Sequence, residues 1–182
     1  MAIIPTLETQ RLRLRPHKPD DLDACTFLWS DPIVTRYIGG RPFTREEVWA
    51  RLLRYTGHWH WMGYGFWVLE ESASGRFLGE IGLAEFKRDV HPPVCEGPEA
   101  GWVLLPEAHG NGFATEALTA ITQWHDARAP QSAITCIIHP DNLASVRVAT
   151  KCSFKQARQT LYKGQPSSVF VRPSQAAQSL YA

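Results

Sequence analysis

With 182 residues, the chain is long enough for one well-packed domain and too short for two of ordinary size. Hydrophobic residues make up 44% and charged residues 20%, a composition typical of a folded protein, which excludes a disordered chain. The net charge of +1 provides no global attraction to nucleic acid or to an anionic membrane, so we expect neither as a partner.

The first half of the chain predicts a strand, helical stretches and an antiparallel hairpin. Residues 11–15 alternate charged and apolar side chains, as a half-buried strand does. Thr44 and Glu47 have the spacing of a capping box, which opens a long helix. Residues 65–69 and 76–86 have the composition of two strands and are joined by a short turn.

The second half predicts strands that alternate with helices and then a last hairpin. The expected elements are a strand at 99–105, a helix at 114–124, a buried strand at 133–138, a helix at 143–151 capped by Asn142, and hairpin strands at 154–161 and 167–171. This order predicts an α/β (α+β) fold with a mixed sheet. We expect a single domain over residues 1–175 and a frayed tail over 176–182.

A glycine-containing loop lies between the strand at 99–105 and the next helix. It reads His109-Gly110-Asn111-Gly112-Phe113-Ala114, with two glycines one residue apart. Glycine adopts positive φ without a Cβ clash, so such a loop can turn several backbone N–H groups toward one point. These N–H groups, together with the helix dipole behind them, favour an anion. The loop therefore predicts a site for a phosphorylated ligand.

Two common phosphate-binding loops do not fit this segment. A dinucleotide fingerprint requires a third glycine three residues after the second, and that position is Thr115. A nucleoside-triphosphate loop ends in Gly-Lys-Ser/Thr, and the segment contains no lysine. On the loop residues alone, an ordinary turn remains the alternative to a phosphate site.

Four segments, taken in order along the chain, match one known family. The main one is 110–117, Gly-Asn-Gly-Phe-Ala-Thr-Glu-Ala. The others are the opening strand at 9–16, the pair Asp31-Pro32, and Asn142-x-x-Ser145 followed by Lys151 and Phe154. Together they resemble the GCN5-related N-acetyltransferase (GNAT) superfamily, in particular its ribosomal-protein N-terminal acetyltransferases. The resemblance spans about residues 7–171, and four motifs in the right order are far more specific than one.

This resemblance implies a mostly antiparallel central sheet with one splayed parallel strand pair, flanked by helices. It implies acetyl-CoA as cosubstrate, with its diphosphate on the glycine loop and its pantetheine arm between the strands at 99–105 and 133–138. A backbone N–H near Val103 or Leu104 would stabilise the oxyanion. The implied cofactor-binding residues are Val103, Leu104, Leu105, His109, Gly110, Asn111, Gly112, Phe113, Ala114, Thr115, Asn142 and Ser145.

The resemblance also implies two catalytic residues. Glu99 occupies the strand position of the general base in some relatives and would act through water; the alternative is a solvated surface carboxylate. In many relatives, a tyrosine seven residues after the asparagine acts as the acid that protonates the thiolate. This chain has Ala149 at that position, so Ser145 is the candidate acid. Simple helix capping is the alternative for Asn142 and Ser145. Lower-ranked candidates are Glu96 and His91 for the base and Tyr162 for the acid.

Two further segments are conspicuous. Residues 58–64 combine two histidines with three aromatic residues, and we expect them to enter the central sheet, with the aromatics in the core or at the mouth of the acceptor site. No cysteine or carboxylate lies near this pair of histidines in sequence, so we expect no metal site. Lys87 and Arg88 are expected at a solvated loop tip.

The expected function is transfer of an acetyl group from acetyl-CoA to a primary amine, by direct attack in a ternary complex. The acceptor is either a protein N-terminus or a small amine such as an amino acid, polyamine or amino sugar. A CoA-binding sensor or scaffold without turnover is the alternative, favoured by Ala149 and by the weakly charged loop, where Asn111 replaces a frequent Lys or Arg. Scattered cysteines and the lack of a leader pattern predict a cytoplasmic protein, either a monomer or a homodimer.

Overall fold

The structure is a computed structural model that describes residues 4–90 and 97–178 of the chain. Its strands are β1 (Leu7–Glu8), β2 (Leu12–Arg15), β3 (Phe66–Glu71), β4 (Phe77–Ala84), β5 (Glu99–Leu104), β6 (Ile134–Ile138), β7 (Lys155–Tyr162) and β8 (Gln165–Arg172). Its helices are α1 (Leu22–Ser30), α2 (Pro32–Thr35), α3 (Arg45–Met62), α4 (Phe113–Asp126), α5 (Leu143–Lys151) and α6 (Gln175–Gln178). Short 3-10 turns at Pro19–Asp21 and Pro106–Ala108 precede α1 and the glycine loop.

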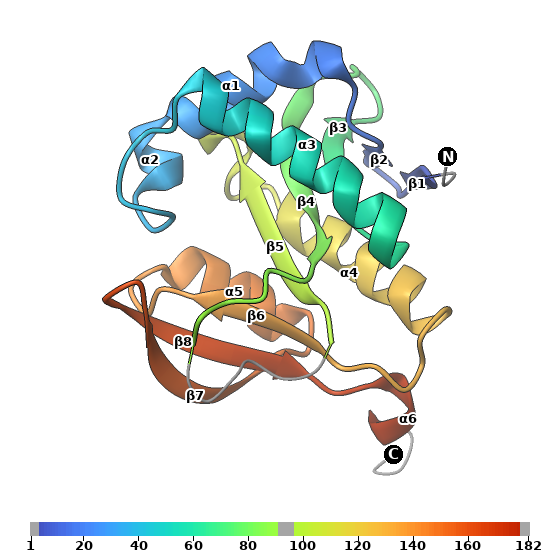
Figure 1. The fold of residues 1–182 in the computed structure, drawn as a ribbon. Coiled ribbons are helices and arrows are strands. Elements are labelled where there is room, and N and C mark those ends of the chain that lie inside the picture. The colour runs from blue at the N-terminus through green and yellow to red at the C-terminus, as the bar shows by residue number, and fades with distance from the viewer. Residues whose placement is uncertain (1–3, 91–96, 179–182) are drawn as a thin grey trace.

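All eight strands form one sheet in the order β1-β2-β3-β4-β5-β6-β8-β7. Every neighbouring pair is antiparallel except β5 and β6, which are parallel and pair only at Glu99 and Thr135. Beyond this point the two strands diverge, as Figure 1 shows. The α/β (α+β) fold class, the mixed and mostly antiparallel sheet, and the splayed parallel pair are thereby confirmed.

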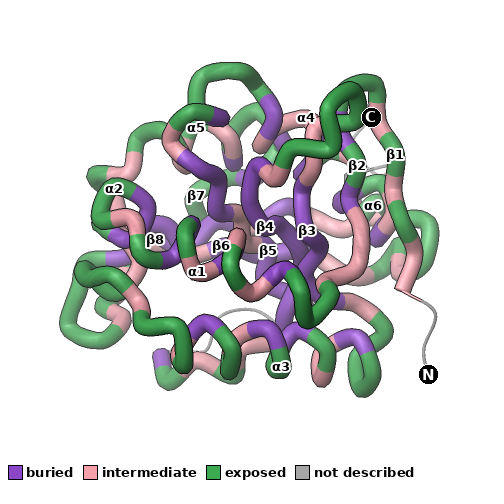
Figure 2. Tube along the Cα trace, turned by 90° about the horizontal axis from the view of Figure 1, so that it is seen from above, coloured by how far each residue is buried: buried purple, intermediate pink, exposed green. Residues whose placement is uncertain are grey.

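Helices cover both faces of the sheet. Figure 1 shows α1 and α3 on one face, with α4 and α5 on the other. Leu28 and Leu52 pack with Val103 under the first layer, while Leu118 packs with Leu83 under the second. Buried residues concentrate in β3, β4 and β5, whereas exposed residues follow the outer turns of the helices (Figure 2). The divergence of β5 from β6 therefore lies inside a sheet that is covered on both faces.

Helix α3 begins where the sequence predicts and ends later than expected. Thr44 and Glu47 form the capping box at its start, and Gly63, with φ of 72°, ends it. Residues 58–62 are thus helical, and the expectation that 58–64 enters the sheet is wrong. The reason is that Trp59 continues the buried helical stripe of α3, and the left-handed conformation that stops the helix is available at Gly63.

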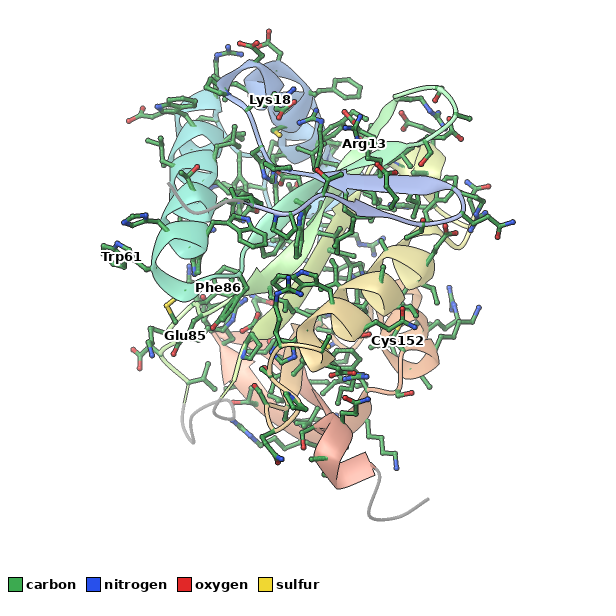
Figure 3. The ribbon with its side chains drawn as sticks, turned by 90° about the vertical axis from the view of Figure 1, so that its right-hand side faces the viewer. Arg13, Lys18, Trp61, Glu85, Phe86 and Cys152 are labelled. Carbon is green, nitrogen blue, oxygen red and sulfur yellow. The ribbon has the colours of Figure 1, made fainter. Side chains whose placement is uncertain are left out.

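The aromatic residues near the end of α3 have different environments. Trp59 is buried and its Nε1 donates to the carbonyl of Phe66 at 3.0 Å, as a core residue should. Trp61 is 85% exposed and points away from the body of the molecule (Figure 3), so a core position is wrong for this residue. Within the part of the chain that the structure describes, no helix has the length and apolar character to cross a membrane.

Candidate active site

The splay between β5 and β6 leaves backbone groups of β5 without strand partners. Val103 pairs with Glu80 of β4, and the Leu105 N–H donates to the Leu78 carbonyl at 2.9 Å. Because successive residues of a strand direct their backbone groups to opposite sides, the N–H groups of Trp102 and Leu104 face the gap. This geometry favours Leu104 over Val103 as a donor into the gap. The Leu104 carbonyl, on the same side, accepts a hydrogen bond from His109 Nε2 at 2.9 Å.

A cavity of about 500 Å³ opens beside this gap. Its walls come from the loop after α2, the inner side of α3, strands β5 and β6, the start of α5 and the β7–β8 turn. The residues that line it include Trp29, Arg36, Arg51, Arg88, Glu99, Trp102, Asn142, Ser145, Tyr162 and Lys163. The cavity thus brings together Glu99, Ser145 and Tyr162, three candidates from distant parts of the sequence. Residues 104–118, which include the glycine loop, do not line it.

Glu99 is buried at the point where β5 and β6 meet, and it is paired. Arg88 donates to both carboxylate oxygens, from Nε at 2.7 Å and from Nη2 at 2.5 Å. Burial alone would lower the pKa of Arg88, but the hydrogen bonds with Glu99 raise it above its ordinary value, so this guanidinium stays charged. The solvated-carboxylate alternative for Glu99 is wrong, because only 7% of the residue is exposed.

Arg88 is also not the solvated loop tip that the sequence suggests. Its guanidinium lies over the rings of Phe86 and Tyr162, at 4.7 and 4.5 Å from their centroids. Lys87 is mostly exposed and pairs with Glu85, as a loop-tip lysine would. The two neighbours diverge because only Arg88 finds a buried carboxylate. The lower-ranked base candidates His91 and Glu96 lie outside the described residues.

Across the gap, the start of α5 supplies the second pair of candidates. The Asn142 side-chain carbonyl accepts from the Ser145 backbone N–H at 3.1 Å, which is the expected N-cap. Both residues also line the cavity, so capping and a role in the cavity are compatible. The cap uses the backbone of Ser145 and not its hydroxyl. Tyr162 approaches the same cavity from the β7–β8 hairpin.

The glycine loop has the backbone conformation that its sequence predicts. Gly110 and Gly112 have φ of 77° and 81°, and α4 begins directly after the second glycine. Arg11, at the start of the opening strand segment, holds the loop from the side. Its Nη1 donates to the Asn111 carbonyl at 3.0 Å, and its Nη2 lies 2.6 Å from Glu116. A guanidinium that is paired with Glu116 therefore supports the backbone of the loop from the side.

Glu116 is the residue that fixes Arg11 against α4. It also accepts from the Thr9 hydroxyl at 2.6 Å and from the Arg11 backbone N–H at 3.0 Å. Partial burial would raise the pKa of Glu116, but these hydrogen bonds hold it below its ordinary value. The Thr-x-Arg pattern of the opening strand and the glutamate of the loop motif thus serve one purpose: they dock the first strand onto the start of α4.

Comparisons with known proteins identify the family of the chain. An acetyltransferase (GNAT) domain model matches residues 11–155. The chain belongs to the GNAT acetyltransferase family. The N-acetyltransferase YoaA of Bacillus subtilis is 28% identical over 168 residues, covering 88% of this chain and 90% of YoaA.

Solved GNAT structures are similar over almost the whole chain. An acetyltransferase from Agrobacterium tumefaciens is 26% identical with a TM-score of 0.79, covering 93% of this chain and 94% of its own. RimL, a ribosomal L7/L12 α-N-protein acetyltransferase in complex with coenzyme A, has a TM-score of 0.77 and covers 94% of this chain and 99% of its own. At 15% identity, the likeness to RimL concerns the fold.

Sequence reasoning missed a buried carboxylate below the cavity that lies beside the splay. Glu80, in the middle of β4, is fully buried and accepts from His17 Nε2 at 2.8 Å, Trp29 Nε1 at 2.6 Å and the Cys25 thiol at 3.2 Å. Burial would raise the pKa of Glu80, but the hydrogen bonds from His17, Trp29 and Cys25 lower it overall. Since Trp29 lines the cavity, Glu80 fixes one of its walls. No sequence motif marks this residue.

His17, Cys25 and Glu80 are also the one group of described side chains whose arrangement could hold a metal ion, with ligand atoms within 4.8 Å of one another. Their hydrogen bonds to each other already satisfy them. The fourth neighbour, Trp29 Nε1, is a donor and offers no lone pair to a metal. The cluster fits a structural hydrogen-bond network better than a metal centre.

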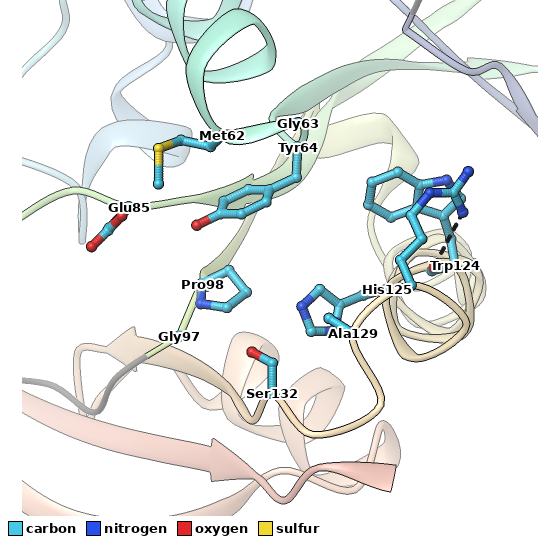
Figure 4. A pocket seen from close by; sticks show the side chains of 11 residues that line it. Met62, Gly63, Tyr64, Glu85, Gly97, Pro98, Trp124, His125, Ala129 and Ser132 are labelled. Carbon is cyan, nitrogen blue, oxygen red and sulfur yellow. Dashed lines mark hydrogen bonds between the residues drawn. The ribbon is translucent and has the colours of Figure 1, made fainter.

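A second cavity of about 450 Å³ lies under the end of α3. Figure 4 shows Tyr64, Pro98, His125 and Ser132 around it. His125 Nδ1 is buried with no hydrogen-bond partner among the described residues, and burial lowers the pKa of this side chain. The cavity contains none of the unpaired backbone of β5. Met62, Gly63 and Tyr64 line this second cavity. No residue of 58–64 lines the cavity beside the splay.

Proposed function

We propose that this GNAT protein transfers an acetyl group from acetyl-CoA to a primary amine by direct attack in a ternary complex. The observation that carries the proposal is the gap at the splay: the N–H groups of Trp102 and Leu104 face this gap, and the cavity that opens beside it is lined by Trp102, Glu99 and Ser145. A thioester needs little activation beyond this, because positioning and deprotonating the amine are sufficient.

The cosubstrate would occupy both the glycine loop and the gap between β5 and β6. The glycine loop and the start of α4 would bind the diphosphate through backbone N–H groups, with Arg11 beside them. The pantetheine arm would lie in the gap as an added strand on the open side of β5. The residues assigned to cofactor binding remain those of the motif, with the Leu104 N–H as the oxyanion donor in place of Val103.

Glu99 is proposed as the general base, acting through water. An ionised carboxylate offers about four lone-pair sites, and Arg88 occupies two of them. The remaining two can hold a water molecule that relays a proton from the incoming ammonium. Arg88 would then be a positioning residue that holds the carboxylate in a fixed orientation.

Ser145 is proposed as the acid that supplies a proton to the departing thiolate. As the amine nitrogen bonds to the acetyl carbon and the carbon–sulfur bond breaks, negative charge develops on sulfur. The hydroxyl of Ser145 is not used by the N-cap, which engages the backbone N–H of this residue. Tyr162 lines the same cavity from the β7–β8 hairpin and is the second candidate.

A thiol-release assay with acetyl-CoA and a panel of amines tests the proposal, alongside the shift in melting temperature caused by CoA. Turnover of an amine together with stabilisation by CoA supports it. Stabilisation by CoA without turnover of any amine would favour a CoA-binding sensor, whose best support is the loss of the tyrosine at Ala149 and the neutralisation of Glu99 by Arg88. Absence of both effects would contradict both functions.

A further inference from the structure

The cavity beside the splay has an unequal distribution of charge. Among the described residues that line it, four carry basic side chains, namely Arg36, Arg51, Arg88 and Lys163, and one, Glu99, carries an acidic side chain. Arg88 and Glu99 neutralise each other through their bidentate ion pair. The remaining three cations leave the cavity with a net positive charge.

Arg51 is held in place without being neutralised. Its guanidinium lies 3.8 Å from the ring centroid of Trp29 and 5.1 Å from that of Phe43, and its Nη1 contacts the Tyr55 hydroxyl at 3.4 Å. Within residues 4–90 and 97–178, no carboxylate lies within 4.0 Å of it. Stacking on aromatic faces orients the planar guanidinium and leaves its N–H donors available.

Arg36 adds a second such cation at the rim. It is exposed, lies over the Tyr37 ring at 5.1 Å, and likewise has no carboxylate partner among the described residues. Arg51 enters the cavity from α3, which covers the face of the sheet opposite α5 (Figure 1). Arg36 lies over Tyr37, whose ring is 5.2 Å from that of His139 in the loop before α5. The two arginines therefore approach the cavity from different walls.

The diphosphate of CoA does not explain these arginines. Its proposed cradle is the glycine loop, and none of residues 104–118 lines this cavity. The loop has its own arginine, Arg11, which contacts the Asn111 carbonyl. The cations of the cavity are thus separate from the cradle and face the acceptor half of the site.

We propose that the acceptor is an amine that also carries an anionic group, a carboxylate or a phosphate, bound by Arg51 with support from Arg36. This inference rests on the proposed transfer reaction and narrows the acceptor class that the sequence left open. A polyamine, with several positive charges, would be repelled by the same side chains. A small amino acid, an amino-alkyl phosphate and an acidic peptide N-terminus share the required chemistry.

Matched acceptor pairs test the proposal on the full chain. Thiol release is measured for ethanolamine phosphate against ethanolamine, β-alanine against β-alaninamide, and the peptide Ala-Asp-Glu-Gly against Ala-Asn-Gln-Gly, at equal concentrations of free amine base, with spermidine as the cationic arm. We expect kcat/KM about tenfold higher for the anionic member of at least one pair, equivalent to ~1.4 kcal/mol, with spermidine below all of them. The pair with the largest ratio identifies the source of the anion.

Arg51→Gln should reduce that ratio to within about twofold, mainly through KM, because the arginine binds ground state and transition state alike. Arg36→Gln should have a smaller effect in the same direction. The control is Arg76→Gln, which removes the same charge from the far β3–β4 turn and should leave the ratio unchanged. Raising the salt concentration should lower the ratio of kcat/KM between the anionic and the neutral acceptor for the wild type, and should leave this ratio unchanged for Arg51→Gln.

The outcomes separate this inference from the proposed function. Equal use of both members of every pair, or preferential use of spermidine, would overturn the anionic acceptor while leaving acetyl transfer intact. If no amine is turned over, calorimetry on CoA-saturated protein with N-acetyl-β-alanine decides: saturable binding that Arg51→Gln abolishes supports the anion site, and absence of binding overturns it.

Discussion

Replacement of Glu80 tests whether the buried carboxylate below the cavity holds its wall in place. Glu80→Ala leaves the ring N–H of Trp29 and the thiol of Cys25 without their acceptor, and removes the partner of His17. Each buried donor left unsatisfied costs about 1–3 kcal/mol. The ring donors of Trp29 and His17 therefore predict a loss of about 2–6 kcal/mol in the free energy of unfolding.

Urea unfolding at neutral pH measures this loss, which corresponds to a fall in melting temperature of about 4–24 °C for a chain of this size. Glu80→Gln keeps the shape and one acceptor oxygen, so its loss should be smaller. Glu8→Ala is the control, since Glu8 forms an exposed ion pair with Arg13 that contributes at most ~1 kcal/mol. A Glu80→Ala protein as stable as Glu8→Ala would refute the reasoning.

The same carboxylate predicts a pH dependence with a defined sign. The pKa of Glu80 is lower in the folded state than its ordinary value of 4.5. Its contribution to stability is therefore fully present above 4.5 and is lost as the pH falls through the folded pKa. The stability difference between the wild type and Glu80→Gln should accordingly narrow below pH ~4.5. A difference that stays constant down to the acid transition would show that Glu80 carries no such linkage.

Three further predictions concern the proposed chemistry. Gly112→Trp should abolish the melting-temperature shift caused by CoA, whereas Gly75→Trp, at a turn glycine with a similar φ of 69°, should retain it; equal shifts would remove the loop from the cofactor site. Glu99→Gln should lower kcat about a hundredfold, and Arg88→Gln much less, since only the first removes a base. Ser145→Ala should lower kcat about tenfold without loss of stability, because the Asn142 cap uses the backbone; an unchanged kcat would assign the acid role elsewhere.

The fold could be predicted from the sequence because its elements have strong local signals. The capping box at Thr44 and Glu47, the alternation at 11–15 and the glycine loop each specify a local conformation through neighbouring residues. The prediction for the end of α3 is wrong because this segment lacks such local signals. Two histidines and two tryptophans have no strong helical preference, and the buried position of Trp59 decided the conformation there through tertiary packing.

The candidate site was only partly predictable, and the division has a physical basis. Asn142 and Ser145 belong to a motif, Glu99 is marked by its strand position in the resemblance, and the structure brings all three to one cavity. Arg88 and Arg51 belong to no motif. Their significance comes from which side chains they meet after folding, a carboxylate for one and aromatic rings without a carboxylate for the other. An arginine read from sequence alone is most often a solvated charge, and nothing nearby in the chain distinguishes these two.

This division explains how the two halves of the proposed site can vary independently. The cofactor half depends on main-chain N–H groups at a loop and a splayed strand, so it needs glycines and a fold and few particular side chains. The acceptor half depends on side chains from the segment after α2, from α3 and from the β7–β8 hairpin, which can be replaced without disturbing that main chain. Family membership therefore supports the proposal of acetyl-CoA, whereas the acceptor has to be argued from the charges of this chain alone. If Arg51→Gln changes which amines are acetylated while leaving the CoA-induced melting shift unaltered, this separation holds; a joint loss of both would mean that the two halves form one binding unit.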